Sequence, residues 1–240
     1  MTNLTASLRL CGVLLLSALW LPAHAQVTIS NNPATANVQG TVLGNSAGVL
    51  ADRYWKAYGI TTSASGTFDF TSLQIAAENE DGAAHTITGG IYTNSAGNPS
   101  STLVPGGAFG SQLIGASAPP ATLLTFTTAG IVTLVPSTTY WFVLTSEAYN
   151  AGGTNFQNVV RWDISTGSVL PSATGAGAGD VILEGYRFSE NNRTSWTGSI
   201  LPNGLTIQLA AHATTAAPEP TSVAFLALGG TLVLARRRRA

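Results

Sequence analysis

Thr139-Tyr140-Trp141-Phe142-Val143-Leu144 is the part of the sequence that says most about the fold. After Thr139 every side chain is apolar, and aromatic and β-branched residues of this kind favour extended backbone. A strand that is apolar on both faces is normally covered on both faces. The stretch therefore predicts a strand inside a β structure, with Trp141 in a core.

Similar strand-like runs lie on both sides of this stretch. Together with this stretch they cover residues 67–75, 85–92, 123–127, 131–135, 139–145, 159–164, 181–188 and 204–210. Between residues 26 and 217 no window keeps a helical period, and the intervening turns are rich in Gly, Asn, Ser and Pro. The expected fold class is all-β: a jelly-roll-like antiparallel β-sandwich, in which two stacked sheets bury many short strands.

Two local features of these runs carry expectations of their own. Phe68, Phe70 and Leu73 do not alternate strictly, which indicates a β-bulge or an early start of the strand. In the turn-rich stretch that follows the second run, Gly97 can supply a positive φ, and Pro99 is expected to end strand pairing.

The N-terminal segment, residues 1–25, has the features of an export signal. It combines a positive charge at Arg9, an apolar stretch over residues 10–21 that is expected to be helical, and small residues before the expected cut. The cleavage site consists of Ala23, Ala25 and Gln26, with the cut after Ala25. The segment predicts a signal peptide that is read by Sec-type export machinery and removed.

Composition excludes several classes of function. Cys11, the only cysteine, lies inside the expected signal peptide, so the processed chain could form no disulfide and no thiolate metal site. Between residues 26 and 217, ten acidic residues stand against five basic ones. A domain with so few cations is not expected to bind nucleic acid.

The C-terminal segment, residues 218–240, has three parts in a fixed order. They are the triplet Pro218, Glu219 and Pro220, an apolar run over residues 223–235, and the cluster Arg236, Arg237, Arg238 and Arg239. As a helix the apolar run would be about 20 Å long and could enter lipid, whereas the arginines resist crossing and stop the tail. A permanent membrane anchor is the alternative reading.

This three-part order resembles the PEP-CTERM sorting signal of Gram-negative bacteria, which membrane-embedded transpeptidases called exosortases process. The resemblance implies an exosortase as partner and a transient intermediate in the inner membrane. The protein would then reside in the cell envelope, at the cell surface or in the extracellular matrix. Residues 26–212 would form the exported β domain, and residues 213–217 would link it to the signal.

A second resemblance concerns the β domain itself. Residues 87–103, with their strand and glycine-proline turn, are followed by Phe126-Thr127 and by the run over residues 132–144. Together they resemble the R type of the choice-of-anchor domains of bacterial surface proteins. These motifs are structural, and the family carries no chemistry that could be transferred to residues of this chain.

Residues that could perform catalysis are scarce, and none is assigned a catalytic role. His85 and His212 are the only histidines after residue 25, and no hydrolase or phosphate-binding motif is present. Asp163, Asp180 and Glu184 are the carboxylates that a sheet could bring together. Nothing in their spacing predicts the separation that a glycosidase needs.

Glu78, Glu80 and Asp81 form the densest acidic cluster, which is expected in a loop between two strands. Their oxygens suit Ca²⁺, but the spacing does not match an EF-hand. A soluble acidic turn is the competing and simpler interpretation. No other cofactor is predicted.

Aromatic residues offer a binding surface. The candidates for stacking on a sugar ring are Tyr54, Trp55, Tyr58, Trp162 and Trp196. The competing interpretation places such rings in the core. Arg53 and Lys56, which flank Tyr54 and Trp55, could equally hold these rings through cation–π contacts.

These observations predict a non-enzymatic, exported protein that an exosortase sorts to the surface or the exopolysaccharide matrix of a Gram-negative cell. The alternative is a carbohydrate-binding module that uses exposed aromatic rings on extracellular polysaccharide. A glycan-cleaving enzyme with a carboxylate pair is a third hypothesis.

Overall fold

The computed structural model describes residues 26–31, 36–45, 53–79, 83–116, 118–147, 160–165, 170–198 and 207–213. The predicted export signal and C-terminal signal, including the two helices expected there, lie outside these ranges. Of the predicted linker, residues 213–217, Ala213 belongs instead to the last strand, and the remaining residues lie outside the described ranges. The β domain, Gln26–Thr214, is one structural unit of the chain. In the described ranges no helix has the length and apolar character that a membrane crossing requires.

In the described part of the chain every strand pair is antiparallel, and the strands form two sheets that are joined at one corner. The first sheet runs in the order β12 (Ser172–Thr174), β1 (Gln26–Ser30), β15 (Gln208–Ala213), β4 (Phe68–Asn79), β11 (Val160–Ser165) and β2 (Ala36–Asn45), with β8 (Ala118–Phe126) and β9 (Val132–Leu134) also paired to β4. The second runs in the order β14 (Thr197–Gly198), β13 (Val181–Ser189), β3 (Arg53–Thr62), β10 (Thr139–Ser146), β5 (His85–Ser95) and β6 (Asn98–Ala108), with β7 (Gln112–Ile114) also paired to β5. The corner is the short pairing of Gly44 and Asn45 with Tyr54 and Arg53.

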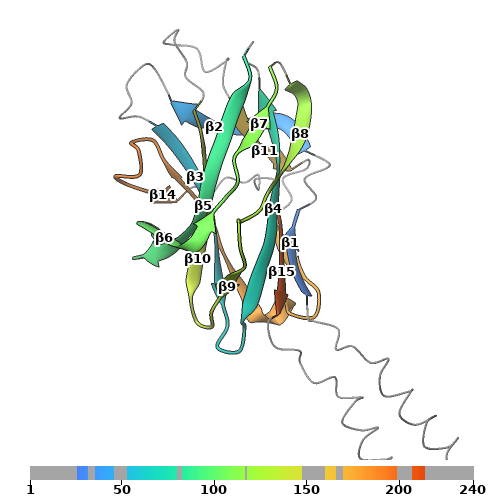
Figure 1. Ribbon diagram of the computed structural model, residues 1–240, viewed down its shortest axis with the longest axis vertical. Coiled ribbons are helices and arrows are strands. Elements are labelled where there is room, and N and C mark those ends of the chain that lie inside the picture. Colours follow the sequence, from blue (N-terminus) through green and yellow to red (C-terminus); the bar gives the residue numbers. More distant parts are fainter. Residues whose placement is uncertain are drawn as a thin grey trace, which may run out of the picture. The chain divides into compact units, whose positions relative to one another are not determined.

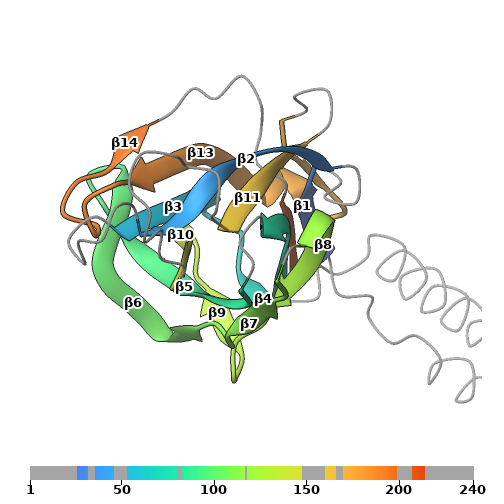
Figure 2. The same cartoon turned by 90° about the horizontal axis from the view of Figure 1, so that it is seen from above.

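The two sheets face each other across one main core. In the end-on view, β3, β5, β6 and β10 lie on one side, and β1, β8 and β11 lie on the other (Figure 2). Phe70 of β4 and Phe142 of β10 meet in this core with their ring centroids 5.6 Å apart. The structure is thus consistent with the predicted β-sandwich.

β4 is the central strand of the first sheet and the longest strand of the domain (Figure 1). Its partner β15 pairs Ala210 with Ser72 and Ala211 with Phe70, which leaves Thr71 as an extra residue. This shift lets Phe68, Phe70 and Leu73 all reach the core despite their uneven spacing. The predicted bulge is confirmed.

β10 has the corresponding position in the second sheet, between β3 and β5. Tyr140, Phe142 and Leu144 face the main core. Trp141 and Val143 face the other way and form a second buried cluster with other residues on the outer face of the sheet. Burial on both faces confirms the prediction made from residues 139–144.

The structure corrects the predicted role of Pro99. The turn lies at Ala96 and Gly97, whose φ values of 50° and 78° are left-handed. The positive φ predicted for Gly97 is therefore confirmed, but Pro99 lies in β6 and pairs with Asn94. β6 ends the order of the second sheet, and an edge strand tolerates a proline because one side of its backbone needs no partner.

Replacing Gly59 with alanine should lower the free energy of unfolding by about 1–3 kcal/mol, because a new methyl group must be forced into a packed site. A Cβ built at Gly59 would lie only 2.6 Å from Cζ3 of Trp141. Gly130→Ala is the matched control, since a Cβ there meets nothing within 4 Å. Chemical denaturation measures both variants, and equal losses would contradict this account of the close approach.

Candidate functional site

The outer face of the second sheet carries a cluster of aromatic side chains. Its buried centre consists of Ala57, Trp141 and Val143. Three half-buried rings pack against this centre: Trp55 from β3, Tyr92 from β5 and Trp196 from the segment before β14. The cluster therefore joins two neighbours of β10 to a loop that lies far away in the sequence.

This loop connects β13 to β14 and is held by hydrogen bonds. Asn192 and Arg193 have left-handed φ values of 53° and 70°. The backbone N–H of Arg193 donates to Oγ of Ser189 at 2.9 Å, and Nε1 of Trp55 donates to Oδ1 of Asn192 at 3.1 Å. These bonds fix an unusual backbone turn over the aromatic cluster.

Arg193 fastens the loop to the rest of the sheet. Its guanidinium carbon lies 4.1 Å from the ring centroid of Tyr92 and 5.1 Å from that of Trp55. Nη2 donates to the carbonyl of Ser100 in β6 at 2.6 Å. One side chain thus links the β13–β14 loop to β3, β5 and β6 through cation–π contacts and a charge-assisted hydrogen bond.

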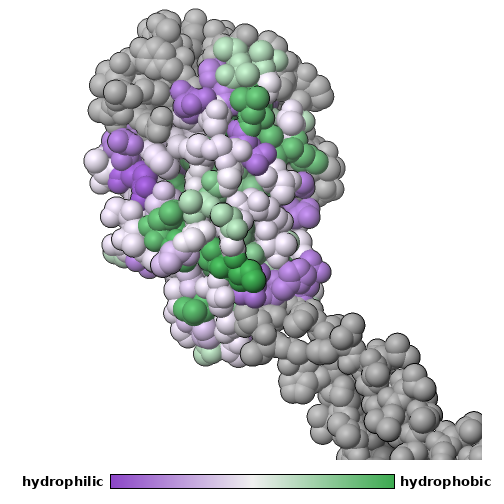
Figure 3. Space-filling view, viewed as in Figure 1, coloured by the Kyte–Doolittle hydropathy of each residue, from purple (hydrophilic) through white to green (hydrophobic). Residues whose placement is uncertain are grey.

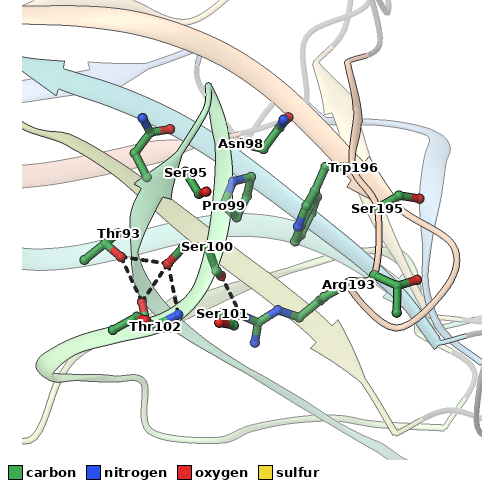
Figure 4. A pocket seen from close by; sticks show the side chains of 12 residues that line it. Thr93, Ser95, Asn98, Pro99, Ser100, Ser101, Thr102, Arg193, Ser195 and Trp196 are labelled. Carbon is green, nitrogen blue, oxygen red and sulfur yellow. Dashed lines mark hydrogen bonds between the residues drawn. The ribbon is translucent and has the colours of Figure 1, made fainter.

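An open groove of about 680 Å³ runs between this loop and the β5–β6 hairpin. Nine of its lining residues carry neutral hydroxyl or amide groups: Thr93, Asn94, Ser95, Asn98, Ser100, Ser101, Thr102, Thr194 and Ser195. Pro99, Trp196 and Arg193 complete the lining. Figure 4 shows the hairpin residues on one side and Arg193, Ser195 and Trp196 on the other.

Hydrogen bonds among the lining residues, and from the lining residues to their neighbours, hold the groove in shape. The hydroxyls of Thr93 and Ser100 lie 2.7 Å apart, and Nε1 of the buried Trp141 donates to Oδ1 of Asn94 at 3.0 Å. On the loop side, Nδ2 of Asn191 donates to Oγ of Ser195 at 2.7 Å. The polar wall is therefore tied to the aromatic cluster beneath it.

The structure separates the five aromatic residues predicted to stack on sugars. Tyr58 and Trp162 point into the main core, so the prediction of exposed rings is wrong for both. Tyr54 and Trp55 are half-buried, and Trp196 alone of the five lines the groove. The sequence signal for the groove is the run of polar residues around Gly97, which by itself indicates only a turn.

Lys56, the only lysine in the chain, is buried among aromatic rings with an exposed fraction of 4%. Nζ lies 4.9 Å from the ring centroid of Phe188 and 5.4 Å from that of Tyr54, so the expected cation–π contact with Tyr54 is present. Burial lowers the pKa of Lys56 to about 8, although the charge of Glu190 opposes this shift.

The carboxylates have structural partners. Glu78 does not lie in the predicted loop but in β4, where β11 continues the pairing and places Arg161 opposite it. The carboxylate is buried, and its Oε1 lies 3.5 Å from Nη1 of Arg161. Glu80 and Asp81 lie outside the described residues. Within the ranges that are described, no group of three or more His, Cys, Asp or Glu side chains could hold a metal ion.

Asp180 and Glu184, two of the carboxylates considered for acid–base chemistry, bind hydroxyl groups. Asp180 accepts hydrogen bonds from Ser63 and Ser65, and these two bonds lower the pKa of its carboxyl group. Glu184 accepts a hydrogen bond from Thr61 at 2.6 Å. Both residues therefore stabilise the strand ends and loops around β3 and β13.

Large apolar side chains are exposed elsewhere on the domain, for example Leu113, Leu123 and Ile131. The face drawn in Figure 3 carries its apolar side chains in separate patches among polar ones. Scattered exposure of this kind is normal for a protein surface in water. The groove is thus the more specific candidate site.

No family model, curated protein or solved structure matches the chain.

Proposed function

We propose that this chain is an exported, non-enzymatic β-sandwich protein of the Gram-negative cell envelope, cell surface or extracellular matrix. An exosortase sorts and processes it through the PEP-CTERM-like segment at residues 218–240. The observation that carries the proposal is the order of the three parts of this segment: the Pro-Glu-Pro triplet, the apolar run and the arginine cluster.

The physical properties of both signals support this route. Residues 10–21 and residues 223–235 are apolar enough to form helices in lipid, and each is flanked by positive charge. The Sec-type machinery would move the domain across the inner membrane. Arg236, Arg237, Arg238 and Arg239 would hold the tail there until Glu219 and its neighbouring prolines are read.

The described domain is compatible with a scaffold role in this setting. Glu78 is buried beside Arg161, and Asp180 and Glu184 accept hydrogen bonds from hydroxyl groups. These contacts support a structural use of the acidic residues over a glycan-cleaving carboxylate pair. We also propose that the sandwich is of the jelly-roll-like type and that the domain is related to the choice-of-anchor domains.

Replacing Glu219 with alanine should block processing of the tail in the producing cells. The wild-type protein is expected to lose residues that follow the triplet, whereas the variant should stay full-length in the inner membrane. Intact mass measured on the envelope and extracellular fractions separates these forms and also reports the signal-peptide cut before Gln26.

Glu190→Ala is the matched control, because Glu190 is an exposed glutamate of the β domain. It should be processed like the wild type. Identical masses and locations for the Glu219 variant and the wild type would overturn the sorting proposal.

A further inference from the structure

We propose that the groove between the β5–β6 hairpin and the β13–β14 loop binds a neutral saccharide chain. Trp196 would supply a stacking surface, and the hydroxyl and amide groups of the hairpin would bond the sugar hydroxyls. This inference goes beyond the sorting proposal and does not depend on it.

The lining of the groove selects for this class of ligand. Serine, threonine and asparagine side chains each donate and accept hydrogen bonds, as sugar hydroxyls do. Among the described residues that line the groove, Arg193 alone is charged, and it already donates to the Ser100 carbonyl and lies against two rings. A phosphate-rich ligand would need more cations, and an apolar peptide would need more apolar lining than Pro99 and Trp196 provide.

Some of the hydrogen-bonding capacity in the groove is unused. Within the part of the chain that the structure describes, the hydroxyls of Ser95 and Ser101 form no side-chain hydrogen bond, and the Nδ2 group of Asn94 donates to no acceptor. Asn94 is oriented because Trp141 donates to its Oδ1 atom. These groups can therefore bond a ligand without breaking an existing contact of the fold.

The groove is also held open before any ligand arrives. Arg193 joins its two sides, because the guanidinium extends from the loop and bonds the hairpin at Ser100. Trp196 packs against the buried aromatic cluster while it lines the groove. A preformed site loses less conformational entropy on binding, which favours affinity. Its volume lies in the range of pockets that hold small ligands.

The test uses the protein purified from the producing cells and an array of immobilised neutral and acidic oligosaccharides, with the neutral polysaccharide from the same cells as a further probe. Binding to at least one neutral glycan is expected. Trp196→Ala should weaken it about tenfold or more, as truncation of a stacking tryptophan does. The double variant Asn98→Ala with Ser101→Ala should also weaken it by about tenfold, since it removes two polar groups.

Thr88→Ala is the matched control, because Thr88 is an exposed hydroxyl residue of β5 that does not line the groove. Its binding should equal that of the wild type. The denaturation midpoints identify any loss that comes from unfolding, and the double variant on the exposed hairpin tests the site if Trp196→Ala does not fold.

Three results would overturn the inference: no binding to any neutral glycan, binding to acidic glycans alone, or neutral-glycan binding that both groove variants retain. None of them bears on the sorting proposal, which the mass of the processed tail tests separately.

Discussion

Replacing Trp162 with alanine is expected to lower the free energy of unfolding by about 3–5 kcal/mol, the usual loss for a large aromatic side chain in a packed core. Trp162 lies in β11 with an exposed fraction of 0% and belongs to the main core. Its removal would leave a cavity between the two sheets, because neighbouring strands cannot close in without breaking their pairing. Equilibrium denaturation followed by circular dichroism measures the loss.

Trp196→Ala is the matched control for this variant. Trp196 is half-buried and packs only at the edge of the smaller aromatic cluster. Its truncation should cost clearly less stability, while it weakens glycan binding. Equal losses for the two variants would show that the assignment of Trp162 to the core and Trp196 to the groove is wrong.

Raising the pH from 7 to about 10 is expected to increase the contribution of Lys56 to the free energy of unfolding, because the buried side chain loses its charge in this range. Its pKa is about 8 in the fold, against an ordinary value of 10.5. Below pH 8 both states carry the charge, and the folded state bears the full cost of about 3 kcal/mol that this shift corresponds to. Between pH 8 and 10.5 the unfolded state binds more protons, so stability rises with pH.

Lys56→Met tests this expectation, because it keeps a long side chain between Tyr54 and Phe188 without the charge. The variant should be more stable than the wild type at pH 7, and the difference should shrink as the pH approaches 10. Urea denaturation at fixed ionic strength measures both profiles. Parallel profiles for the two proteins across this range would refute the proposed cost of the buried ammonium.

Tyr58 sets an upper limit to this pH range. Burial raises its pKa to about 12 from an ordinary value of 10.0. Above pH 10 the unfolded state loses the phenol proton first, so the stability of the fold, which keeps this ring neutral, declines. The rise that comes from Lys56 is therefore best measured below pH 10.

A strand can be predicted from the sequence when the apolar side chains in it are the ones that the sandwich buries. β10 is predictable because each of its faces packs in a buried cluster. The uneven spacing of Phe68, Phe70 and Leu73 in β4 is informative because the bulge lets all three side chains reach the core. β3 carries no such signal. In β3 the side chain of Lys56 points inward. Because a charged residue occupies a buried position, the alternation of polar and apolar residues that marks a strand is not visible in the sequence.

Pro99 shows a second limit of local reasoning. A proline in a strand is excluded from the middle of a sheet but not from its edge, and the edge position of β6 depends on the order of all strands in the second sheet. Glu78 is a similar case. Its place in β4 depends on Arg161, which β11 brings opposite it from a distant part of the sequence.

The order of neighbouring residues is enough to predict the all-β class and the buried central strand, because each is a local pattern, and the two proposed terminal targeting signals rest on local patterns as well. The choice of which aromatic rings are buried, and the position of the groove, come from the packing of the whole domain. Arg193 meets Ser100 across 93 positions of the chain, and Trp55 meets Asn192 across 137. Such contacts depend on which strands lie side by side, and local propensity carries no information about that.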